Sequence, residues 1–140
     1  MSEPFVRFLY SMLNIPYRWG GQDFLGVDCS GLAQLALQTV GLDPSGDQTA
    51  QTLYNWFYKD SFTKMYPELG TLLFHGHTVN SITHVRIALD DKFCIEAGGG
   101  DSTCLTLEFA RKKNACVRIR PISSRNFDQI AKLTPRYPWL

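Results

Sequence analysis

The sequence contains no apolar run near the ~20 residues that a membrane-spanning helix needs. It has no excess of either charge, because 14 Lys and Arg stand against 13 Asp and Glu, so a broad nucleic-acid-binding surface is not expected. It also lacks the charged, apolar and small-residue regions of a secretory signal peptide. These absences favour a protein with no membrane span and no nucleic-acid partner.

Cysteine is sparse and unpaired in the sequence. The four residues, Cys29, Cys94, Cys104 and Cys116, form no C-x-x-C pair and no dense framework, so free thiols are expected. There is no internal repeat and no low-complexity linker. A chain of 140 residues can bury a core, and we expect one domain over residues 1–140.

The first part of the chain has helical periodicity. A helix that Ser2 caps is expected to end near Asn14, and Tyr17–Val27 is predicted to be a loop. A second helix is predicted from about Cys29 to Val40, before Gly41. Asp47 is expected to cap a third, strongly aromatic helix.

Strand patterns then take over, and Asn126 is expected to cap a short final helix. The predicted strands begin with 71–74 and continue with Thr83–Leu89, Lys92–Ala97, Ser102–Leu107 and Ala115–Pro121. Helices followed by an antiparallel sheet predict an α+β fold, with N-terminal helices packed on a central sheet.

Cys29 is the candidate nucleophile because it begins the second predicted helix. Free backbone N–H groups and the positive end of the helix dipole favour a thiolate there. The alternative is a buried structural cysteine, since free cysteine is among the most buried residue types.

A thiol nucleophile needs a base and a group that orients the base. His84 begins an apolar β-branched stretch, and Glu96 is the one polar side chain between Ile95 and Ala97. A hairpin turn at 90–91 makes the two approximate cross-strand neighbours, so Glu96 could hold the imidazole. A solvated strand residue is the alternative for Glu96.

Four segments resemble the NlpC/P60 family of papain-like cysteine peptidases. They are Pro16-Tyr17-Arg18-Trp19-Gly20-Gly21, Asp28-Cys29-Ser30-Gly31-Leu32, Leu69-Gly70-Thr71-Leu72-Leu73-Phe74 and Thr83-His84-Val85 with the following hairpin. They cover about residues 5 to 120 in the expected order. The resemblance implies hydrolysis of bacterial cell-wall peptides next to γ-linked D-glutamate, with no cofactor and no metal.

The resemblance also implies roles for individual residues. Cys29 matches the nucleophile, His84 the base and Glu96 the third polar position. Tyr17 resembles an aromatic residue that helps the oxyanion site, while Asp28 and Ser30 resemble residues that line the substrate cleft.

Three departures keep alternatives open. The third position is commonly His in this family but is Glu96 here, which leaves CHAP-like peptidoglycan amidases or endopeptidases as a second candidate. Arg86 replaces a small residue after His-Val, and the Pro-Arg-Thr-Ser signature is missing. A catalytically decayed binding module on the same scaffold, or an acyl transferase, is also open.

A zinc site is the remaining alternative, because His75 and His77 would share one face of a strand and His84 or a Cys could supply another ligand. Gly76 between them favours a loop instead. With no signal peptide in view, the expected location is the cytoplasm, as synthesised, or a phage tail or cell-wall system. Product specificity and oligomeric state are left open.

Overall fold

The computed structural model describes residues 2–140 and has the predicted α+β architecture. Its helices are α1 (Glu3–Ser11), α2 (Cys29–Gln38), α3 (Ala50–Phe57), α4 (Leu107–Lys113) and the 3₁₀ helix η1 (Ile122–Arg125). Its strands are β1 (Gln22–Asp23), β2 (Gly26–Val27), β3 (Leu72–Gly76), β4 (Ile82–Ala88), β5 (Phe93–Gly98), β6 (Cys116–Pro121) and β7 (Gln129–Leu133). A two-stranded sheet joins β1 to β2, and the main antiparallel sheet has the order β6-β5-β4-β3-β7.

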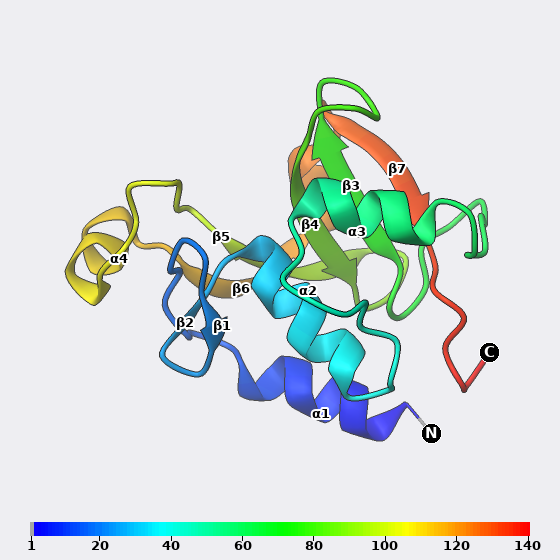
Figure 1. Cartoon of the computed structure of the whole chain (residues 1–140), viewed down its shortest axis with the longest axis horizontal. Helices are drawn as coiled ribbons and strands as arrows, with labels where there is room; N and C mark the ends of the chain where they lie inside the picture. The colour runs from blue at the N-terminus through cyan, green and yellow to red at the C-terminus, as the bar shows by residue number, and fades with distance from the viewer. Residues whose placement is uncertain (1) are drawn as a thin grey trace.

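One face of the main sheet carries the hydrophobic core. Alternate strand residues point to this face, and those that do, including Phe74, Ile87 and Ile95, are buried against residues of the helices such as Leu32 and Leu53. In Figure 1, α1, α2 and α3 lie on the same side of this sheet, while α4 lies apart near β5 and β6. Burial of these apolar side chains stabilises the packing of α2 against β4 and β5.

The opposite face of the sheet is covered by the connection between β6 and β7. These two strands are the edges of the sheet, so the chain of residues 122–128 crosses from one edge to the other. Ile122 packs there against Leu73, Ala88 and Cys94, which are strand residues of the parity that faces away from the helices. This crossing segment, residues 122–128, therefore forms a second and smaller layer.

The α2–α3 connection is fixed by a buried amide. Gln34 of α2 is 1% exposed, and its Oε1 accepts hydrogen bonds from Gln22 Nε2 (2.6 Å) and from the backbone N–H of Gln48 (3.0 Å). Its Nε2 donates to the Gly46 carbonyl oxygen at 3.0 Å. A buried amide that is satisfied in this way holds the loop before α3 in one conformation.

Two sequence-based expectations for the last third of the chain are wrong. Residues 102–107 do not form a strand; residues 102–106 form a turn, and Leu107 begins α4, which Thr106 caps by accepting from the Phe109 N–H at 3.2 Å. Asn126 does not begin a helix, because β7 follows it and pairs with β3. Pairing with β3 satisfies the backbone there, which local sequence preference could not reveal.

The expected helix caps are also partly wrong. Thr49, not Asp47, caps α3, and it forms a capping box in which Thr49 Oγ1 accepts from the Thr52 N–H and Thr52 Oγ1 accepts from the Thr49 N–H. Ser2 precedes α1 but makes no side-chain capping hydrogen bond. The predicted loop at 17–27 contains the short β1–β2 pair.

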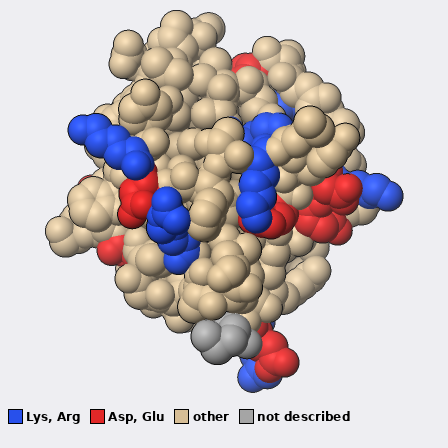
Figure 2. Space-filling view, turned by 90° about the vertical axis from the view of Figure 1, so that its right-hand side faces the viewer, with Lys and Arg blue, Asp and Glu red and all other residues tan. Residues whose placement is uncertain are grey.

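Charged side chains of both signs are interspersed on the face in Figure 2, with wide uncharged areas between them. Within residues 2–140, no helix has the length and apolar character needed to cross a bilayer.

Candidate active site

Cys29 is the first residue of α2 and is half-buried at the wall of a cavity of about 790 Å³. Asp28 caps the helix, since one carboxylate oxygen accepts from the Gly31 N–H at 2.8 Å and the other accepts from the Gly20 N–H at 2.9 Å. Gly31 must be glycine, because a Cβ there would overlap the carbonyl oxygen of Gly21. The Gly20–Gly21 pair thus packs directly on the helix turn that presents the thiol.

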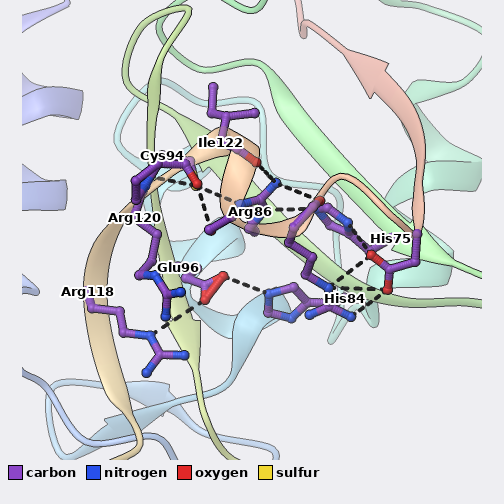
Figure 3. Close-up of polar contacts among 12 residues, drawn as sticks. His75, His84, Arg86, Cys94, Glu96, Arg118, Arg120 and Ile122 are labelled. Carbon is purple, nitrogen blue, oxygen red and sulfur yellow. Dashed lines mark hydrogen bonds and ion pairs between the residues drawn. The ribbon is translucent and has the colours of Figure 1, made fainter.

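His84 and Glu96 meet as the hairpin predicted. The β4–β5 pairing joins Ile87 to Ile95 and Ala88 to Cys94, which places His84 one diagonal step from Glu96. The distance from His84 Nε2 to Glu96 Oε1 is 3.3 Å, and both side chains are largely buried (Figure 3). The ring also hydrogen-bonds to Cys29, so the imidazole lies between the thiol and the carboxylate.

Cys29 and Glu96 both stabilise the protonated form of the His84 ring. Burial would lower the pKa of His84, but hydrogen bonds to Cys29 and Glu96 and the negative charges of both raise it to about 9. Burial would raise the pKa of Glu96, but the hydrogen bond to His84 and the positive charges of His84 and Arg118 lower it to about 2. At neutral pH the site therefore holds an imidazolium beside a carboxylate.

The other three predicted site residues also line the cavity. Tyr17 is 5% exposed, and burial together with negative charge at Cys29 and Asp28 raises the pKa of its hydroxyl, which keeps it protonated as a donor. Ser30 is buried and its hydroxyl donates to Asp28 at 3.2 Å. The polar atoms of Asp28 and Ser30 thus contact the helix turn rather than the open cavity.

Sequence reasoning missed the basic wall of the cavity. Arg118 and Arg120 of β6 line it, as do Arg125 and Phe127 of the crossing segment. Arg118 Nε lies 3.7 Å from the second oxygen of Glu96. The sequence predicts only that Arg118 and Arg120 share one face of a strand, because residues at i and i+2 do; it does not predict which face that is.

A buried arginine lies beneath the crossing segment. Arg86 is 0% exposed, and its guanidinium donates to His75 Nε2 (2.8 Å), Cys94 Sγ (3.2 Å) and the carbonyl oxygen of Ile122 (3.0 Å). His75 Nδ1 lies 2.9 Å from Asp128 Oδ1. Arg86 thus ties β4 to the start of the crossing segment (Figure 3), and His75 of β3 holds the end of that segment through Asp128.

This arrangement argues against a zinc site at His75 and His77. Burial and the charge of Arg86 lower the pKa of His75 to about 4, so its ring is neutral, and both ring nitrogens already have partners. His77 is exposed. Within residues 2–140, no group of three or more His, Cys, Asp or Glu side chains could hold a metal ion.

Solved structures share the fold. The peptidoglycan hydrolase RipB of Mycobacterium tuberculosis is 22% identical, with a TM-score of 0.71 over 96% of this chain and 64% of that one. The P60 domain of the M. avium subspecies paratuberculosis antigen MAP1204 is also 22% identical, with a TM-score of 0.70 over 95% of this chain and 92% of that one. RipD of M. tuberculosis, a non-catalytic NlpC/P60 protein adapted to peptidoglycan binding, is 18% identical, with a TM-score of 0.70 over 96% of both chains.

Sequence comparison points to the same family. Dipeptidyl-peptidase 6 of Lysinibacillus sphaericus is 45% identical over 40 residues, which are 29% of this chain and 15% of that protein. The sequence pattern of the NlpC/P60 family matches residues 14–120. That match spans Cys29, His84 and Glu96, and the chain belongs to the NlpC/P60 family.

Proposed function

We propose that the protein is a cysteine peptidase that hydrolyses peptide bonds in bacterial cell-wall peptides next to γ-D-glutamyl residues. One observation carries the proposal: a half-buried thiol at a helix N-terminus faces an imidazole whose other side contacts a carboxylate. Thiol, imidazole and carboxylate are the parts that nucleophilic acyl transfer requires. The family and its structurally similar hydrolases support peptidoglycan as the source of the substrate.

The chemistry would proceed through an acyl-enzyme. The Cys29 thiolate attacks the carbonyl carbon, and the oxyanion accepts hydrogen bonds from N–H groups at the start of α2 and from the Tyr17 hydroxyl. The His84 imidazolium then donates its proton to the leaving amine, and the C–N bond breaks. Water attacks the thioester while neutral His84 accepts a proton, and the carboxylic acid leaves as Cys29 is regenerated.

Product analysis tests the proposal. The protein is incubated with muropeptides of known sequence, and the products are identified by mass spectrometry. Cleavage that leaves a C-terminal γ-D-glutamyl residue and a free amine on the next residue supports it. Cleavage between the sugar lactyl group and L-alanine would instead show a CHAP-like amidase, and saturable binding without products would show a binding module, as the name of RipD describes. Activity should survive EDTA, because the proposed steps use only side chains of the chain.

Glu96 should control the charge of His84. In Glu96→Gln an acceptor oxygen remains but the anion is lost, so the pKa of His84 should fall from about 9. A lower pKa means that His84 loses its proton at a lower pH in the variant than in the parent. We expect alkylation of Cys29 by iodoacetamide to slow by up to about tenfold near pH 8, where the His84 ring of the parent is still charged and that of the variant is not. Near pH 6 both rings are charged, so the two rates should be similar there.

Glu108→Gln is the matched control, because Glu108 is an exposed carboxylate in the first turn of α4. Its alkylation profile should match that of the parent. Superimposable profiles of Glu96→Gln and the parent would remove Glu96 from the triad and leave a Cys29–His84 dyad.

A further inference from the structure

Two arginines of the basic wall lie on one face of β6, because side chains alternate along a strand. Register pairs Arg118 with Glu96 and Arg120 with Cys94, so both arginines and Glu96 project from the same face of the sheet. All three line the cavity that contains Cys29. In Figure 3 the guanidinium groups of Arg118 and Arg120 lie on the same side of β6 as the Glu96 carboxylate.

These guanidinium groups are poorly paired. Arg118 contacts Glu96 only at 3.7 Å, and its buried Nε has no hydrogen-bond partner. In the part of the chain that the structure describes, no hydrogen bond or ion pair involves the Arg120 guanidinium. The one carboxylate at this wall, Glu96, also contacts His84 and is stabilised by the charge of Arg86. The wall therefore carries an excess of positive charge.

The other acidic groups of the cavity do not balance this excess. The Asp28 carboxylate accepts two backbone hydrogen bonds at the start of α2. Asp101 forms an ion pair with Lys113 at 2.7 Å. Asp47 enters the cavity from the loop before α3 and not from β6.

We infer that Arg118 and Arg120 form a subsite for a carboxylate group of the substrate. Like charges at adjacent positions of one strand face repel, and an anion between them removes the repulsion. The donors of both guanidiniums can bind a carboxylate through charge-assisted hydrogen bonds, which are the stronger class of hydrogen bond. The inference rests on the proposed function and narrows its substrates to peptides with a free carboxylate, either on the glutamyl residue or at the C-terminus that follows the scissile bond.

Binding is measured by calorimetry on the Cys29→Ala protein, which keeps peptides intact. The probes are L-alanyl-γ-D-glutamyl-L-lysyl-D-alanine and two analogues, one amidated at the glutamyl α-carboxyl group and one at the C-terminus. We expect one of the two amidations to weaken binding by about tenfold or more, the range of a charge-assisted hydrogen bond. Adding Arg120→Gln should weaken binding of the free acid and abolish the difference, while Arg120→Lys should retain part of it.

Arg111→Gln is the charge-matched control, because Arg111 is exposed on α4 and lies outside this cavity. It should leave all three affinities unchanged. The inference is overturned if both amidations leave the affinity unchanged, if Arg120→Gln preserves the preference, or if none of the peptides binds saturably. Hydrolysis by the parent protein is measured separately. If the three peptides bind equally and the parent cleaves them, only the subsite inference is overturned. If binding depends on a free carboxylate but the parent cleaves none of the peptides, only the peptidase proposal is overturned.

Discussion

Replacing Cys29 by alanine is expected to reduce peptide hydrolysis by about 10⁴-fold or more, without loss of the fold. The side chain is half-buried at the cavity wall, so removing one sulfur atom leaves the core packing intact. No other thiol can replace it, because Cys94 and Cys104 are buried and burial raises the pKa of both. The rate is measured with the muropeptide that the parent cleaves, and the fold is checked by circular dichroism and thermal unfolding.

Cys116→Ala is the matched control, since Cys116 is also half-buried but lies outside the cavity that contains Cys29. It should keep the parent rate. Full activity in a folded Cys29→Ala protein would contradict the role of the thiol.

Arg86→Ala is expected to lower the free energy of unfolding by about 3–5 kcal/mol, as is typical when one partner of a buried charged network is removed. Arg86 heads the largest fully buried side chains, so truncation opens a cavity between the sheet and the crossing segment. It also removes the donors to the Ile122 carbonyl oxygen and to His75 Nε2. Denaturant unfolding of the two proteins measures the loss.

Two variants test how much of this destabilisation comes from lost packing and how much from lost hydrogen bonds. Arg86→Met restores most of the volume but no donor, so it should recover the cavity part of the loss and not the hydrogen-bond part. Arg111→Ala removes an exposed arginine and should change stability by no more than about 0.5 kcal/mol. A loss below about 1 kcal/mol in Arg86→Ala would mean that Arg86 does not anchor the crossing segment.

Sequence patterns predicted the structure correctly where the residues in contact lie close together in the chain. Helical periodicity located α2 with Cys29 at its first residue, and hairpin counting brought His84 to Glu96. Both inferences depend on spacing within one helix or one hairpin, which backbone geometry fixes.

Contacts between distant segments could not be predicted in the same way. β7 forms because β3 has an unpaired edge, and β3 lies more than fifty residues earlier in the chain. Arg86 looked from the sequence like a substitution for a small residue, yet it is buried because carbonyl groups of residues 122–128 meet it there. The basic wall was missed because the direction of the β6 side chains depends on register with β5.

The central claim is that Cys29 and Glu96 hold His84 between them as an imidazolium. NMR titration of the ring nitrogens tests it directly, because the chain has only three histidines and the pKa of His75 is lowered to about 4. In the parent, His84 should stay protonated at pH 7.5 and titrate near pH 9, and in Cys29→Ala its pKa should fall because the hydrogen bond and negative charge of Cys29 are lost. A His84 ring that is neutral at pH 7.5 in the parent, or that titrates at the same pH in both proteins, would contradict this claim.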